Sequence, residues 1–162
     1  MTRFRSTILI AALAALAVAT AASAGVTKNP PISFTGKYAG QATTKVDGST
    51  VTIAANGTGS GTLLGTGSIT ASGTGDSSQQ PCVPFGGTGT IVGKLGTIVF
   101  KANPGASGCG DDGGHVFSVT GRLVVTKATG KLAKAKGTLK LTGTYSRDDG
   151  SFSVKVAGTL TK

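Results

Sequence analysis

Glutamate and tryptophan are absent from this sequence, which also has only one His, one Met and two Cys. Its 6 acidic residues are all Asp and stand against 16 Lys and Arg residues, so the formal net charge is +10. General acid–base catalysis and metal sites depend on carboxylates, imidazoles and thiolates. Their scarcity favours a protein that is not an enzyme and that needs no metal and no cofactor. The positive charge favours anionic partners.

Long apolar runs are also missing, except for one near the N-terminus. Arg3 and Arg5 precede an apolar stretch at residues 8–21, and Ala22-Ser23-Ala24 supplies the small residues of a signal-peptidase site. We therefore expect a signal peptide at residues 1–24, a flexible segment at 25–31 and a folded domain at 32–162. The protein would then be secreted or periplasmic, within the cell envelope, and not transmembrane after cleavage. An uncleaved anchor helix is the alternative, although a span needs about 20 apolar residues.

The composition disfavours helices, because the chain holds 27 Gly and each Gly costs about 1 kcal/mol relative to Ala in a helix. Apolar and polar residues instead alternate, most clearly at residues 151–161. A period of two is typical of a strand with one buried face. The segment before it alternates in the same way, and Asp149-Gly150 between the two runs predicts a β-hairpin over residues 137–161.

The same alternation recurs at residues 33–46, 49–55, 63–71, 89–93, 96–101 and 115–126. These segments predict an all-β fold, a single small antiparallel β-barrel of about eight strands. Gly at inward positions favours the barrel over a two-sheet sandwich, because Gly permits tight bends. Residues 72–86 are expected to form a loop. Lys140 and Lys155 should be exposed. The side chains expected in the core are Phe100, Leu123, Leu139, Leu141, Phe152, Val154 and Val156.

The two cysteines, Cys82 and Cys109, predict one disulfide, as is usual for an isolated pair in an oxidising compartment. We expect the disulfide to hold two long loops together, at residues 77–87 and 103–114. A catalytic thiol is the alternative, and its base would have to be His115, the one His of the chain.

Residues 124–139 resemble a segment of the dirigent proteins and allene oxide cyclases with the pattern G-T-G-x-F-x-x-A-x-G. Ala128-Thr129-Gly130-Lys131-Leu132 corresponds to its first half and Ala135-Lys136-Gly137 to its second. Residues 34–38 and 150–160 also resemble exported bacterial relatives of these families. The resemblance implies an eight-stranded barrel, often a homotrimer. It assigns no pocket residues to this chain, because none of the family's pocket residues can be matched. The segment also departs from the pattern, since Ala128 replaces the first Gly and Leu132 replaces the aromatic residue.

Five lysines lie in a short segment without acidic residues, which we call the basic segment. Its members are Lys127, Lys131, Lys134, Lys136 and Lys140. It could bind an anionic cell-envelope polymer, or it could be a solvated face. Nucleic acid fits poorly, since few aromatic residues are available for stacking. Asp111, Asp112 and His115 offer a weaker alternative, a cation site in what otherwise reads as a turn.

These observations predict an exported, disulfide-linked β-barrel whose role is non-catalytic binding or association with the envelope. One alternative is a dirigent- or cyclase-like barrel that guides a reaction of a small hydrophobic ligand in its lumen. Another is a surface adhesin or structural component. The barrel interior discriminates between the first two. Convergent polar groups in the lumen would favour guided chemistry, and a lumen filled by Phe, Leu and Val would favour binding or a structural role.

Overall fold

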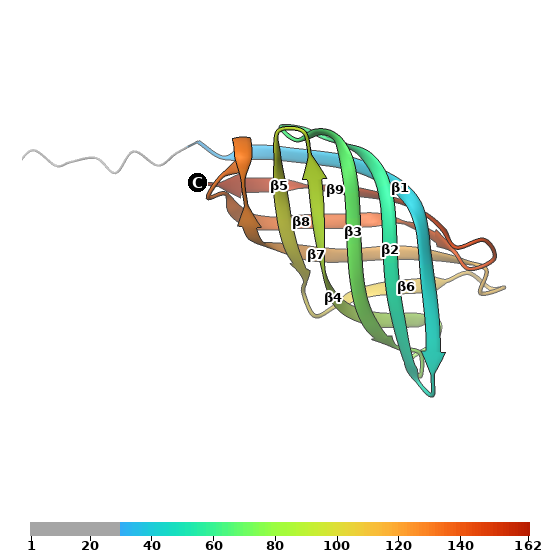
Figure 1. The fold of residues 1–162 in the computed structure, drawn as a ribbon. Coiled ribbons are helices and arrows are strands. Elements are labelled where there is room, and N and C mark those ends of the chain that lie inside the picture. The colour runs from blue at the N-terminus through green and yellow to red at the C-terminus, as the bar shows by residue number, and fades with distance from the viewer. Residues whose placement is uncertain (1–29) are drawn as a thin grey trace, which may run out of the picture.

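The structure, a computed structural model, describes residues 30–162 as a closed antiparallel β-barrel of eight strand positions (Figure 1). The predicted barrel is therefore confirmed. The signal peptide predicted at residues 1–24 and most of the segment 25–31 lie outside the described residues. Among residues 30–162, no helix has the length and apolarity needed to span a membrane.

Nine strands and one short 3-10 helix make up the fold. They are β1 (Ile32–Asp47), β2 (Thr50–Gly61), β3 (Gly65–Asp76), β4 (Cys82–Gly93), β5 (Gly96–Ala102), β6 (Ala106–Gly110), β7 (Val116–Ala128), η1 (Gly130–Leu132), β8 (Lys136–Ser146) and β9 (Ser151–Thr161).

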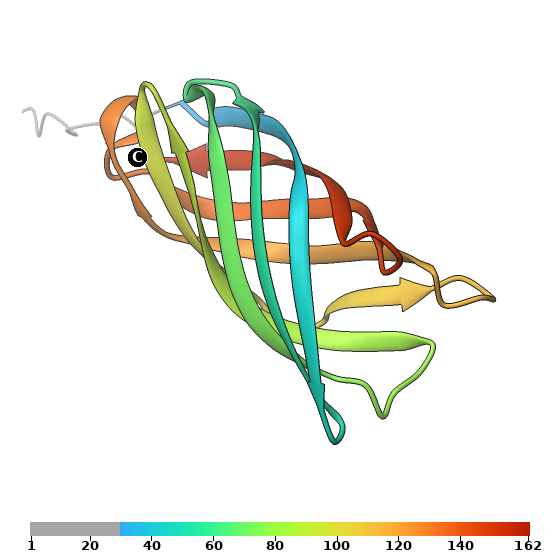
Figure 2. The same cartoon turned by 45° about the vertical axis from the view of Figure 1, so that its right-hand side comes forward.

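The topology is a meander that closes on itself. Each strand pairs antiparallel with the next one around the wall, and β9 returns to pair with β1. β5 and β6 share one position, because both lie between β4 and β7. The residues between them, Asn103-Pro104-Gly105, interrupt what is otherwise one long strand. Closure leaves no long unpaired edge. The strands are tilted relative to the barrel axis, so those of the two opposite walls run in different directions in Figure 2.

The hairpin predicted at residues 137–161 is present as β8 and β9, with Leu141 opposite Val156. The predicted loop at residues 72–86 is wrong, because β3 continues to Asp76 and β4 already begins at Cys82. The predicted loop at 103–114 likewise contains β6. The strands were missed because Gly occupies inward positions such as Gly73 and Gly87, which removes the apolar half of the alternation.

Bulky side chains fill one end of the barrel, and we call this group the plug. It consists of Phe34, Tyr38, Leu64, Ile91, Ile98, Leu132, Leu139, Val156 and Leu160, each no more than 2% exposed. The turns at this end also bond to one another, since Leu95 N donates to Leu64 O at 3.1 Å and Lys131 N donates to Leu95 O at 2.9 Å. This end of the lumen is therefore closed.

The predicted core is confirmed in part. Phe100, Leu123, Leu139 and Val156 are buried, and Lys140 and Lys155 are exposed. Leu141, Phe152 and Val154 face inward as predicted but are only half-buried. They lie beyond the plug, where the lumen is not filled.

Candidate ligand-binding cavity and basic wall

The half of the lumen opposite the plug is a cavity of about 440 Å³. Most of its lining is apolar, with side chains contributed from all around the barrel. Six of the larger ones are Ile53, Phe85, Phe117, Leu141, Phe152 and Val154. Val46 lines it at the outermost inward position of β1 and is 63% exposed, so the cavity reaches the solvent. Its volume lies within the range of about 300–1,000 Å³ typical of small-molecule sites.

The cavity exists because small residues occupy many inward positions of this half. Ala55 of β2, Ala71 of β3 and Gly108 of β6 all line it. The plug end also has glycines at inward positions, such as Gly59 and Gly61 of β2, but the rings of Tyr38 and Phe34 occupy the space beside them. Alternation along the strands thus fixes which residues face the lumen, and the placement of the large side chains around the barrel determines where the lumen is empty.

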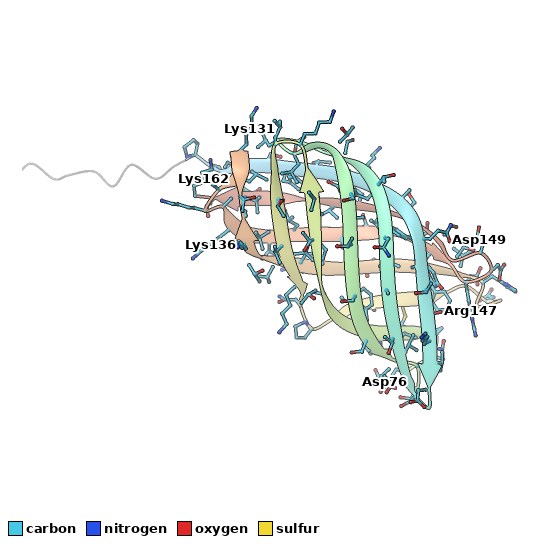
Figure 3. All side chains as sticks on the ribbon, in the orientation of Figure 1. Asp76, Lys131, Lys136, Arg147, Asp149 and Lys162 are labelled. Carbon is cyan, nitrogen blue, oxygen red and sulfur yellow. A yellow bond between two sulfur atoms is a disulfide. The ribbon has the colours of Figure 1, made fainter. Side chains whose placement is uncertain are left out.

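Polar side chains meet the cavity near its outer end. Tyr145 of β8 and Thr44 of β1 both line it, and the Tyr145 Oη lies 3.4 Å from the Thr44 Oγ1. Arg147 follows Tyr145 by two residues and also lines the cavity. Its place at the end of the barrel away from Lys131 and Lys162 is visible in Figure 3. None of these three residues was predicted as a site residue from the sequence. Every second residue of β8 faces the lumen up to Tyr145, and the same alternation carried two residues further leads to Arg147.

The strand ends and loops around this open end, which we call the rim, carry all 6 acidic residues of the protein. Asp47 ends β1, Asp76 ends β3, Asp111 and Asp112 follow β6, and Asp148 and Asp149 follow β8. Ser78 hydrogen-bonds the Asp76 carboxylate and lowers its pKa. The backbone N–H of His115 lowers the pKa of Asp111, and that of Ser151 lowers the pKa of Asp149. These carboxylates therefore act largely as turn residues.

His115 joins two loops of the rim. Its Nδ1 lies 2.8 Å from the Asp148 Oδ1, and the Arg147 N–H donates to the His115 backbone carbonyl at 2.8 Å. The hydrogen bond from Asp148 raises the pKa of His115, and the negative charge of Asp148 adds to this effect. The predicted alternative of a cation site at Asp111, Asp112 and His115 finds no supporting arrangement. Within residues 30–162 no group of three or more His, Cys, Asp or Glu side chains could hold a metal ion.

The disulfide between Cys82 and Cys109 is present, with 3.9 Å between the two Cα atoms. The expectation that it joins two loops is wrong. Cys82 begins β4, Cys109 lies in β6, and the two are direct register partners. The bond therefore fastens the short strand β6 to the wall at the open half. No free cysteine is present in the described part of the chain.

All five lysines of the basic segment are exposed, but they do not form one compact patch. Lys127 is near the end of β7, Lys131 and Lys134 belong to the turn around η1, and Lys136 begins β8. Figure 3 shows Lys131 and Lys136 near the plug end, together with Lys162. Lys140 lies further along β8, on the outer wall.

A second set of cations on the outer wall became visible only through the strand register. Arg122 of β7 is directly opposite Lys140 of β8, and Lys37 of β1 is directly opposite Lys155 of β9. All four side chains are exposed. Lys155 is two residues from Ala157, the partner of Lys140, so the two pairs are diagonal neighbours. We call Lys37, Arg122, Lys140 and Lys155 the cationic band. Like charges directly opposite each other destabilise a sheet.

No family model matches the chain, and no curated protein or solved structure matches it either.

Proposed function

We propose that this protein is an exported, disulfide-linked β-barrel that binds a small apolar ligand in the open half of its lumen. The observation that carries the proposal is the cavity of about 440 Å³ with its largely apolar lining. A ligand that buries roughly 250 Å² of apolar surface there would gain about 6 kcal/mol at about 25 cal/mol per Å². That corresponds to a dissociation constant on the order of tens of micromolar before ordering costs.

Binding is favoured over catalysis by the residues of the lining. Among the described residues that line the cavity there is no Asp, Glu, His, Lys or Cys side chain. Its ionisable groups are Tyr145 and Arg147, both toward the outer end. The dirigent- or cyclase-like alternative would have to guide a reaction mainly through the shape of the cavity, with Tyr145 as the candidate general acid or base among the described lining residues.

Adjacent alanines of β2 provide a matched test. Ala55 lines the cavity, whereas Ala54 points outward and is exposed. The purified protein would be titrated with Nile red, a neutral apolar dye whose emission rises in an apolar site. We expect Ala55→Trp to weaken this rise, because the indole takes up space in the cavity, and Ala54→Trp to retain it.

Circular dichroism and thermal unfolding would establish that both variants fold. If Ala55→Trp does not fold, Ala71→Val on β3 provides a milder reduction of the same cavity. Equal dye binding by wild type and a folded Ala55→Trp or Ala71→Val variant would refute binding in the lumen, as would no dye binding by the wild type.

The cationic band supports a second function, retention on an anionic cell-envelope polymer. Two pairs of like charges are tolerated in direct opposition on one wall. Within residues 30–162 the one ion pair described is between His115 and Asp148, on the rim, so no described carboxylate lies within ion-pairing distance of the band. An anionic polymer laid across β7, β8, β9 and β1 would relieve this repulsion.

Chromatography on a polyanionic resin distinguishes binding through the cationic band from binding through the basic segment. One variant carries Gln at Lys37, Arg122 and Lys155, and the other carries Gln at Lys131, Lys134 and Lys136, so each removes three charges. We expect the first to elute from a polyanionic resin at lower salt than the second. Retention should vanish near 1 M salt, where the Debye length is about 3 Å compared with about 8 Å at 0.15 M. If the two variants elute at the same salt concentration, net charge alone explains retention and a specific role of the cationic band is refuted.

A further inference from the structure

We propose that the cavity selects amphiphiles with an anionic head, binding the apolar tail in the lumen and a carboxylate at Arg147, Tyr145 and Thr44. This inference rests on the proposed binding function and adds the chemical class of the ligand. It follows from how the polar groups are distributed along the lining.

The polarity of the lining changes along a single strand. The inward positions of β8 run from Leu139 in the plug through Leu141 and Gly143 to Tyr145, and Arg147 continues the same period beyond the strand end. The lumen therefore offers apolar contacts at depth and a cation near its outer end. A ligand complementary to this order has an apolar tail and a negatively charged head.

Arg147 is the one charged side chain among the described residues that line the cavity. It forms no ion pair with any described residue, although Asp148 and Asp149 follow it directly. The Asp148 Oδ1 instead lies 2.8 Å from the His115 Nδ1, and the Asp149 Oδ1 accepts the Ser151 N–H at 2.9 Å. The nearest acids in the sequence are thus engaged in the turn, and the guanidinium is available to a ligand. A guanidinium binds a carboxylate through two parallel hydrogen bonds.

Two hydroxyls complete the head site. Tyr145 comes from β8 and Thr44 from β1, strands separated by β9, yet their oxygens are only 3.4 Å apart. Each hydroxyl has one proton to donate. A carboxylate oxygen placed beside this pair would accept hydrogen bonds from it.

The six carboxylates of the rim do not reverse this selectivity. None of them lines the cavity, and those whose bonds are described above are tied into turns. Charges on exposed loops act through water and salt, which screen them beyond about 8 Å at physiological ionic strength. A head group in contact with Arg147 lies well inside this screening distance, so its attraction to the guanidinium outweighs its repulsion by the more distant carboxylates.

The test uses three probes with the same ten-carbon tail and different heads: decanoate, 1-decanol and decylammonium. Their affinities would be measured at neutral pH, below the micelle concentration, by displacement of Nile red. We expect decanoate to bind about tenfold more tightly than 1-decanol, with decylammonium weakest. Arg147→Gln should remove the advantage of decanoate and leave the affinity for 1-decanol unchanged. Lys45→Gln is the matched control, because Lys45 is an exposed cation next to Thr44 on β1 that does not line the cavity, and it should change neither affinity.

The outcomes separate this inference from the proposed function. If Nile red fails to bind wild type, binding of apolar ligands in the lumen is itself refuted. If 1-decanol binds and decanoate is no tighter, or if Arg147→Gln leaves the preference intact, the binding function stands and the head site is refuted. Tightest binding of decylammonium would assign selection to the rim carboxylates and would also overturn the inference.

Discussion

Among residues 30–162, His115 is the one side chain that joins two rim loops through a titratable contact. Its imidazole and the Asp148 carboxylate are 63% and 65% exposed, so solvent screens their attraction and the pair adds little to global stability. The backbone bonds from Arg147 N to His115 O and from His115 N to the Asp111 carboxylate hold the same loops independently of pH. The ion pair therefore affects the local order of the rim and not the fold.

We predict that NMR titration gives His115 a pKa above its ordinary 6.5, because the Asp148 carboxylate favours the imidazolium. Since the folded pKa is the higher one, the contribution of the pair is complete below the unfolded pKa and is lost as the pH rises through the folded pKa. Asp148→Asn should bring the pKa back toward 6.5, and Asp112→Asn should have a smaller effect. A wild-type pKa at or below 6.5 would contradict the contact.

Leu139 and Leu141 face inward from the same strand but have different surroundings. Leu139 is fully buried in the plug, whereas Leu141 lines the cavity and is half-buried. We predict that Leu139→Ala costs about 2–5 kcal/mol of the free energy of unfolding. Leu141→Ala should cost about 1 kcal/mol, because less of its surface leaves water on folding. Denaturant unfolding measures both, and equal costs would mean that the lumen is filled throughout.

At the scale of elements, the sequence predicted those strands whose inward positions carry apolar side chains. β8 and β9 were predicted nearly to their ends. The ends of β3 and β4 were missed, because Gly73, Gly75 and Gly87 contribute backbone but no apolar side chain to the pattern. Cys82 and Cys109 were paired correctly, but β6 could not be recognised, since its Gly-rich five residues depend on β4 and β7 for their ladder.

Two adjacent glycines of β4, Gly86 and Gly87, differ in how closely the backbone of the neighbouring strand approaches them. A Cβ on Gly87 would lie 2.3 Å from the Ser72 backbone O of β3, whereas a Cβ on Gly86 meets nothing within 4 Å. We predict that Gly87→Ala costs about 1–3 kcal/mol, because the two strands must separate. Gly86→Ala should be neutral or stabilising by up to about 1 kcal/mol, since it restricts the unfolded chain. Thermal unfolding measures the pair, and equal shifts in Tm would contradict the close approach.

The whole molecule is a cup with opposite charge at its two ends. Its acids surround the rim, and lysines lie around the plug end, as Figure 3 shows for Asp76, Asp149, Lys131 and Lys162. The wall is also divided, since the strands β2, β3 and β4 carry no Lys or Arg and the cationic band crosses β7, β8, β9 and β1. The basic segment was visible in the sequence because its members lie close together along the chain. The band, the rim and the cavity were not, because each requires the register of a closed barrel.

One end of the barrel is filled and the other is open. We therefore predict that the free energy of local opening varies along each strand and not from one strand to the next. Packed side chains support the backbone ladder around Leu139 and Val156, whereas near Val51 and Tyr145 the ladder surrounds an open cavity. Local opening costs least where few buried contacts are lost. We expect amide hydrogen exchange, followed by mass spectrometry, to be slow in the plug half and faster in the open half of β1, β2, β8 and β9. Decanoate should slow exchange in the open half alone. Uniform protection along these strands would show that the two halves of the barrel open as a single unit.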